Sequence, residues 1–120
     1  LKEAGVRWCC DWVNDELPWR FTNGLINLPL NHELSDRQII TVQQQSVDSF
    51  AEQMRDACDW LAAEAEAGGG RMLPIHLTPY IMGLPYRITA LEALLQWLAA
   101  RPDCWFACGG DIVRCWEAQP

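Results

Sequence analysis

A short apolar run near the middle of the chain, residues 72–77 (MLPIHL), constrains the fold more than any other feature of the sequence. Three consecutive glycines precede this run, and Pro79, Gly83 and Pro85 follow it. An apolar run of this length between glycine and proline is typical of a strand that is buried on both faces, as in a parallel sheet covered by helices. His76 is the one titratable residue of the run. Because α/β enzymes place catalytic groups where such strands end, His76 is the first candidate for a functional residue.

The rest of the chain alternates between strand-like and helix-like patterns. Short apolar segments predict further strands at residues 6–10, 24–30 and 104–108. Apolar residues that recur every three or four positions predict helices at residues 46–67, 87–100 and 109–118, of which the first has Ser46 as its N-cap. Residues 1–5 resemble the last turn of a helix that Gly5 closes. Strands that alternate with helices favour an α/β fold with about four parallel strands and three helices.

Length and composition limit the classes of protein and partner. With 120 residues the chain is at most one domain, and it is shorter than the roughly 200 residues that a complete α/β barrel needs. Its net charge of −7 argues against binding to the phosphate backbone of a nucleic acid. No apolar run approaches the roughly 18 residues of a membrane span, and no signal segment is visible at the start. We therefore expect a cytoplasmic protein with neither a nucleic-acid nor a membrane partner.

The six cysteines favour free thiols over a disulfide framework. Cys9 and Cys10 are adjacent, and Cys58 lies within a helical pattern. Cys104, Cys108 and Cys115 lack the paired short spacing and the nearby histidines of a zinc site. Buried thiols in a reducing compartment are the simpler interpretation.

His76 and several other residues could contribute chemistry. His76 itself could donate a proton to a departing amine or stabilise an oxyanion, although the residues alone favour a core histidine bonded to a backbone carbonyl. Asp11 and Asp15 lie in an acidic, aromatic segment and either bind substrate or form a solvated loop. Arg87 either binds a carboxylate or carbonyl group or lies as a charge at the start of a helix, where cations are disfavoured.

Aromatic residues and a further histidine complete the candidates. Trp12 and Trp19 flank the acidic segment and could stack on a sugar or on a flat amide ring. His32, Glu33 and Asp36 could be imagined as metal ligands, but their position in a turn between elements favours an ordinary polar turn.

Three segments resemble the polysaccharide deacetylase (NodB homology) family, and in particular its branch of cofactor-independent allantoinases. Residues 3–19 resemble that branch's strand and acidic turn, here Asn14-Asp15-Glu16-Leu17-Pro18-Trp19. Residues 25–40 resemble its Leu-Pro segment, which leads to an aspartate. Residues 75–98 resemble its His-Pro-x-x-x-Gly-x-Pro-x-Arg segment and the helix that follows, with the departure that Leu77 and Thr78 separate the histidine from the proline.

The resemblance implies a fold and an activity. It implies that residues 1–120 are the C-terminal part of a distorted TIM-like (β/α) barrel whose N-terminal half is absent, and that the complete protein hydrolyses non-peptide carbon–nitrogen bonds. His76 then takes the position of the general acid. The family's base and metal ligands lie in an Asp-Asp pair and a His-x-x-x-His motif, which this sequence lacks. We therefore expect no cofactor in this chain, a zinc-type metal only in the complete enzyme, and little activity of the chain alone.

The resemblance also implies a substrate class, and a second interpretation stays open beside it. Asp11, Trp12, Asp15, Trp19 and Arg87 are the expected substrate-binding residues, for an N-acylated sugar or a ureide-type molecule. The alternative is a non-catalytic half-barrel that serves as a binding or interaction module. An open half-barrel leaves strand edges and apolar faces unpaired, so it would need a partner or self-association to cover them.

Overall fold

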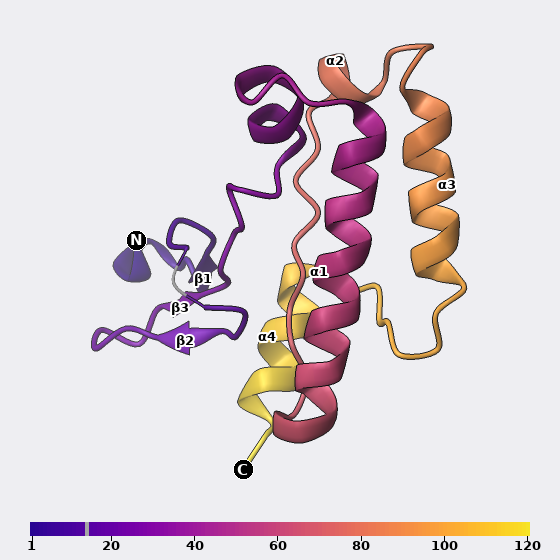
Figure 1. The fold of residues 1–120 in the computed structure, drawn as a ribbon. Helices are drawn as coiled ribbons and strands as arrows, with labels where there is room; N and C mark the ends of the chain where they lie inside the picture. Colours follow the sequence, from indigo (N-terminus) through magenta and orange to yellow (C-terminus); the bar gives the residue numbers. More distant parts are fainter. Residues whose placement is uncertain (14) are drawn as a thin grey trace. The chain divides into compact units, whose positions relative to one another are not determined.

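The computed structural model describes Leu1–Val13 and Asp15–Pro120, so that Asn14 of the acidic turn lies outside the described residues. The chain divides into two compact units. The first comprises Leu1–Leu30 and Phe106–Pro120, and the second comprises Asn31–Trp105. Figure 1 shows the elements of each unit. No helix in the described part of the chain is long and apolar enough to cross a membrane.

The first unit contains a sheet of three short strands with the order β1-β3-β2. Strands β1 (Trp8–Cys9) and β3 (Ile26–Asn27) are parallel, with Trp8 opposite Ile26. Strand β2 (Trp19–Arg20) pairs antiparallel with β3. The same unit holds the 3₁₀-helix η1 (Lys2–Ala4), which ends at the left-handed Gly5, and the helix α4 (Gly109–Glu117). Its buried apolar residues are Leu25, Ile26, Leu28 and Val113.

This mixed sheet corrects the prediction of about four parallel strands. The segment that contains Trp19 lies outside the predicted strands, yet it pairs with β3 as half of a hairpin. The chain reverses between the two strands, where the Phe21 N–H donates to the Leu25 carbonyl at 2.9 Å. Gly24 adopts a φ of 82°, which disfavours residues with a side chain and permits this tight reversal.

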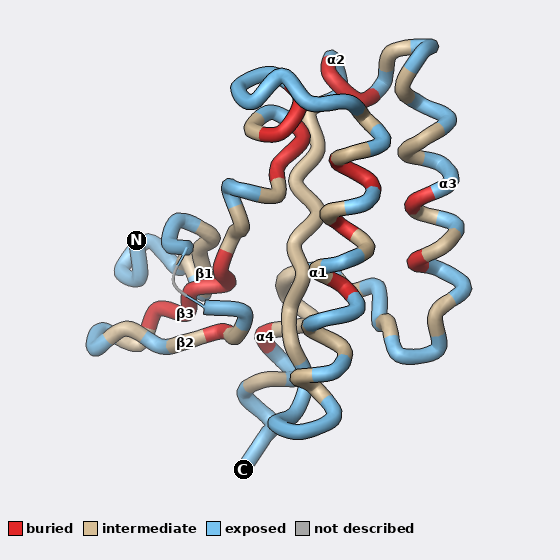
Figure 2. Tube along the Cα trace, in the orientation of Figure 1, coloured by how far each residue is buried: buried red, intermediate tan, exposed pale blue. Residues whose placement is uncertain are grey.

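The second unit is helical. Helix α1 (Val47–Gly68) lies beside α3 (Ile88–Ala99), and a π-helix η2 (Arg37–Val42) and the short α2 (Pro79–Met82) complete the unit (Figure 1). The prediction of Ser46 as N-cap is confirmed, because its hydroxyl accepts a hydrogen bond from the Ser49 N–H at 3.1 Å. The inward faces of these helices form one apolar cluster, shown as the buried stretches in Figure 2: Ile39, Ile40, Phe50, Ala51, Met54, Cys58, Ile81, Met82, Leu94 and Leu98.

The predicted strands at residues 72–77 and 104–108 are wrong for the described chain. Residues 71–78 instead run as an irregular segment alongside α1 (Figure 1). Alternate residues of this segment, Leu73, Ile75 and Leu77, pack against the apolar cluster, so its inward face follows the period of two that a strand would show. A strand also needs a neighbour that pairs with its backbone, and no such ladder is formed along this segment within the described residues.

Candidate active site

The candidate site in the second unit is centred on His76, close to the end of the segment that packs on α1. The His76 carbonyl accepts a hydrogen bond from the Asp36 N–H at 3.3 Å. The side-chain Nδ1 atom is buried and has no hydrogen-bond partner in the part of the chain that the structure describes. Sequence reasoning offered a core histidine bonded to a backbone carbonyl as the ordinary interpretation. The structure gives Nδ1 no such bond among the described residues.

Asp36 fixes the backbone of the segment that carries His76. Its side chain is completely buried. One carboxylate oxygen accepts the Thr78 backbone N–H at 2.5 Å, and the other accepts the Thr78 hydroxyl at 3.0 Å. The backbone of Asp36 binds residue 76 and its side chain binds residue 78, so that one aspartate holds both ends of the short stretch around His76.

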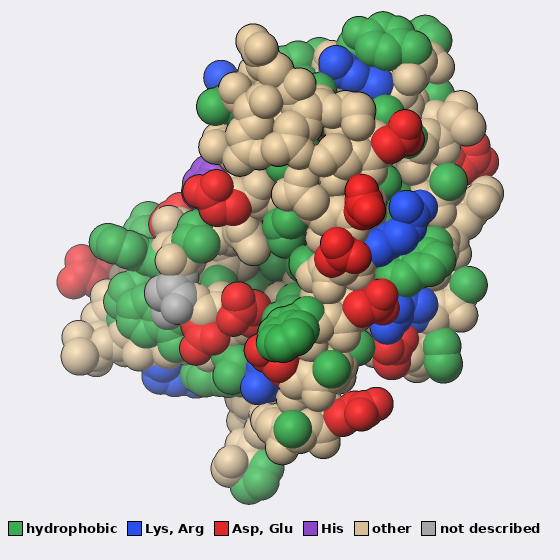
Figure 3. All heavy atoms as spheres, in the orientation of Figure 1, with side chains coloured by type: hydrophobic (Ala, Val, Ile, Leu, Met, Phe, Trp, Pro, Cys, Tyr) green, Lys and Arg blue, Asp and Glu red, His purple; other side chains and the backbone are tan. Residues whose placement is uncertain are grey.

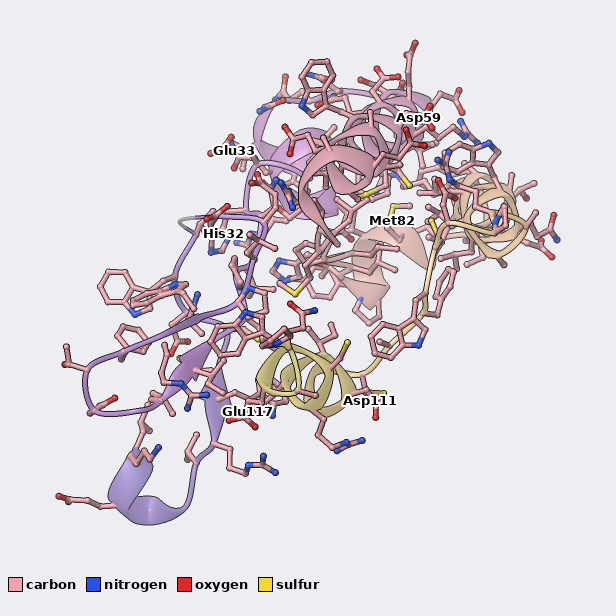
Figure 4. All side chains as sticks on the ribbon, turned by 90° about the horizontal axis from the view of Figure 1, so that it is seen from below. His32, Glu33, Asp59, Met82, Asp111 and Glu117 are labelled. Carbon is pink, nitrogen blue, oxygen red and sulfur yellow. The ribbon has the colours of Figure 1, made fainter. Side chains whose placement is uncertain are left out.

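A polar turn ahead of η2 places Asp36 and brings a second histidine near the first. The Asn31 side chain accepts the Glu33 N–H at 3.1 Å, and the Ser35 hydroxyl donates to the His32 carbonyl at 2.8 Å. These local bonds shape the turn that directly precedes η2. The exposed His32 ring then lies 6.0 Å from the His76 ring, centroid to centroid (Figure 4 labels His32).

Arg87 lies in the second unit at the start of α3. Its guanidinium donates to the Ile81 carbonyl at 3.1 Å and lies 5.1 Å above the Tyr86 ring. Sequence analysis offered a carboxylate or a carbonyl group as the partner of Arg87. In this structure a backbone carbonyl of the chain itself, that of Ile81, is such a partner. Its role toward a substrate stays a prediction.

The other predicted substrate-binding residues lie in the first unit, where Asn27 holds the backbone of Trp12. The Asn27 amide accepts the Trp12 N–H at 3.2 Å and donates to the Trp12 carbonyl at 3.0 Å, while the Trp12 ring is 59% exposed. Asp11 is also exposed. Asp15 is exposed and accepts the Glu16 N–H at 2.8 Å. The Trp19 ring lies 4.0 Å from Phe21. Their part in binding stays a prediction.

The cysteine beside Asp11 is poorly suited to act as a nucleophile. Burial raises the pKa of the Cys10 thiol, and the charges of Cys9 and Asp11 raise this pKa further. Because the thiolate is the reactive form, a raised pKa keeps Cys10 protonated near neutral pH.

Sequence reasoning found His76 but missed the residues that surround it. Asp36 and His32 were judged to be turn residues, and Asn27 was not singled out. One signal was available, because residues 25–40, which resemble a family segment that leads to an aspartate, include Asp36. Among the described residues, no group of three or more His, Cys, Asp or Glu side chains could hold a metal ion. Acidic side chains are spread over the face drawn in Figure 3, in keeping with the net charge of −7.

Comparisons with known proteins show which proteins this chain resembles. No protein-family model matches the chain. The structure is similar to that of Puue allantoinase, with a TM-score of 0.86 and 31% identity over 98% of this chain. It is similar to that of a Pseudomonas aeruginosa PAO1 protein named as a polysaccharide deacetylase, with a TM-score of 0.83 and 29% identity over 97% of this chain. A Schizosaccharomyces pombe protein named as a polysaccharide deacetylase is 27% identical over 113 residues, 90% of this chain.

These relatives are named as an allantoinase and as two polysaccharide deacetylases. The chain matches a C-terminal fragment of the NodB-like polysaccharide deacetylase family, and the resemblance predicted from its motifs is confirmed. It spans 35% of the length of the Schizosaccharomyces pombe protein and 40% of each of the two solved structures.

Proposed function

We propose that this chain is the C-terminal part of a hydrolase that cleaves non-peptide carbon–nitrogen bonds, with His76 as its general acid. The buried Nδ1 of His76, which has no partner among the described residues, is the observation that carries this assignment. A buried polar nitrogen left without a hydrogen bond costs about 1–3 kcal/mol, so a substrate or a group from outside the described chain is the natural partner. The likeness to deacetylases and to allantoinase supports the reaction class.

The chemistry asked of His76 is a single proton transfer. After attack on an amide carbonyl, the protonated imidazole gives its proton to the departing nitrogen as the carbon–nitrogen bond breaks. Asp36 contributes by holding residues 76 and 78, which limits the positions that the imidazole can adopt. Asp11, Trp12, Asp15, Trp19 and Arg87 remain the proposed substrate-binding residues, and an N-acylated sugar or a ureide remains the proposed substrate class.

We propose that this chain is part of a TIM-like barrel in a larger, complete enzyme. The general base and any metal would come from the rest of that enzyme. The described residues do not group the ligands that a zinc-type ion needs, and no step of the proposal runs through a metal. The chain alone is therefore expected to turn over neither an N-acetyl sugar nor a cyclic ureide at a rate near that of the complete relatives.

A chimera tests the role of His76. The segment of Puue allantoinase that corresponds to this chain would be replaced by this chain, and ureide hydrolysis would be measured. His76→Asn should lower kcat by about a hundredfold or more, whereas His32→Asn should change it little. Circular dichroism checks that each chimera is folded. A folded His76→Asn chimera with undiminished kcat would contradict the assignment.

The exposed aromatic side chains of the second unit favour a second candidate, a non-catalytic interaction module. Trp60 is 69% exposed and Trp105 is 63% exposed, and aromatic residues are enriched at protein–protein interfaces relative to the rest of the surface. Size-exclusion chromatography with light scattering separates the cases. A stable monomer favours an independent module, and dimerisation or aggregation favours a part of a larger barrel.

A further inference from the structure

Two cysteines of the second unit, far apart in the sequence, lie with their sulfur atoms in contact. The Cys58 and Cys104 Sγ atoms are 3.7 Å apart, across a separation of 46 residues. Cys58 is buried in α1, and Cys104 is partly buried in the irregular segment after α3. A disulfide requires about 2.05 Å between the sulfur atoms, so a movement of less than about 2 Å would bring this pair to bonding distance.

Arg101 holds the two cysteine-bearing segments together. Its guanidinium forms an ion pair with Asp59, the residue after Cys58, and a two-pronged pair with Asp103, the residue before Cys104, at 3.0 and 2.7 Å. The Trp97 ring lies 4.7 Å from the same guanidinium. Figure 4 shows Asp59 on the side of α1 that faces α3. Arg101 therefore binds the immediate sequence neighbours of both cysteines.

We propose that Cys58 and Cys104 are a thiol pair that a low-molecular-weight disulfide converts into an intramolecular disulfide joining α1 to the segment after α3. The Cys104 thiolate attacks one sulfur of the small disulfide, forms a mixed disulfide and releases one thiolate. Cys58 then attacks the Cys104 sulfur and releases the second small thiol. The protein loses two hydrogen atoms, and the small disulfide is reduced to two thiols.

The environments of the two sulfurs fit this order of attack. Burial raises the pKa of Cys58 to about 11, and the hydrogen bond and charge of Cys104 add to the effect. Cys58 is therefore protonated near neutral pH and shielded from reagents. Cys104 is the more accessible of the two, so it reacts first, and Cys58 resolves the mixed disulfide because it is already in contact.

The other four cysteines allow a clean test, because Cys9, Cys10, Cys108 and Cys115 all belong to the first unit. In a variant that carries serine at these four positions, glutathione disulfide should give a protein two hydrogen atoms lighter, with the Cys58 and Cys104 peptides joined. Dithiothreitol should reverse the change. The joined protein should unfold about 10 °C higher than the reduced protein.

Three further variants on this background complete the test. With Cys58→Ser, Cys104 should stop at the mixed disulfide with glutathione. Arg101→Gln should slow ring closure about fivefold, whereas Arg55→Gln, which removes a cation 5.9 Å from the same Trp97 ring, should not. Two free thiols after oxidation, or a mixed disulfide at Cys104 that persists while Cys58 is intact, would overturn the proposal.

Discussion

The carboxylate of Asp36 accepts both the backbone N–H and the hydroxyl of Thr78, a residue 42 positions further along the chain. A third bond to the same carboxylate comes from the Arg37 N–H at 2.7 Å. This relationship joins the start of η2 to the segment that carries His76. It is a tertiary contact between the fully buried Asp36 and the partly buried Thr78.

Loss of the Asp36 carboxylate should therefore destabilise the second unit strongly. Asp36→Ala leaves three donors without their acceptor, and we expect the free energy of unfolding to fall by about 3 kcal/mol. Thr78→Val removes only the hydroxyl bond and should cost about 1 kcal/mol. Urea denaturation measures both. Glu66→Gln, at an exposed position of α1, is the control and should stay within about 0.5 kcal/mol of the wild type. An Asp36→Ala protein as stable as this control would show that the hydrogen bonds of the Asp36 carboxylate do not stabilise the second unit.

Asn27 should be sensitive to the loss of a single donor. Asn27→Asp keeps the oxygen that accepts the Trp12 N–H but loses the donor to the Trp12 carbonyl, and it introduces a charge at a fully buried position. We expect a cost of about 2 kcal/mol or more in urea denaturation.

A second asparagine provides the matched control for this substitution. Asn23 is exposed, and its oxygen accepts the Leu25 N–H at 3.0 Å, a bond that an aspartate can also accept. Asn23→Asp should therefore be nearly neutral. Equal losses for the two substitutions would mean that the paired bonds of Asn27 to Trp12 contribute little.

The helices could be predicted from the sequence because their signals are local. Apolar residues at three- and four-residue spacing and a capping serine define α1 within one turn at each end. The strands could not be predicted as well, since a strand depends on a partner elsewhere. Residues 72–77 have the composition of a strand but no ladder among the described residues, whereas Trp19 gains a partner from a turn at Gly24.

The residues of the candidate site differ in the same way: some can be recognised from the sequence around them, and others only from contacts with distant segments. His76 was identified because a titratable ring in an apolar run is visible in the sequence itself. Asp36 was judged to be a turn residue, since nothing near it in sequence reveals that Thr78 would meet its carboxylate. The contact of Cys58 with Cys104 was missed for the same reason, because contact between distant segments is set by the packing of α1 and α3.

Two adjacent glycines of α4 should respond differently to the same substitution. A Cβ atom at Gly109 would lie 2.6 Å from the Trp8 ring and 3.1 Å from the Leu28 side chain, whereas at Gly110 the nearest atom is 3.6 Å away. We expect Gly109→Ala to cost about 1–3 kcal/mol through overpacking against β1. Gly110→Ala should be neutral or stabilise by up to about 1 kcal/mol, because alanine favours the helix.

Thermal unfolding followed by circular dichroism can compare these two variants directly. Since both substitutions add one methyl group to the same turn of α4, the difference between them isolates the contacts with Trp8 and Leu28. Equal midpoints would show that the ring moves aside without cost.

Glu117 of α4 should make stability depend on pH in the acidic range. The hydrogen bond from Arg20 at 3.0 Å lowers the pKa of Glu117 below its ordinary value of 4.5, and Arg7 at 3.3 Å adds to the effect. A carboxylate with a lowered pKa in the folded state stabilises that state above the ordinary pKa. This stabilisation is lost as the pH falls below 4.5 and through the folded-state pKa.

Glu117→Gln should therefore lower the urea midpoint at neutral pH and leave it unchanged at strongly acidic pH, where the wild-type side chain is also neutral. Because the pair is exposed, high salt should reduce the difference at neutral pH. Arg20→Gln should abolish most of the pH-dependent difference, and Arg7→Gln should abolish less, since the Arg20 bond is the larger cause of the lowered pKa. A difference between wild type and Glu117→Gln that persists unchanged into strong acid would show that packing, and not the charge of Glu117, is responsible.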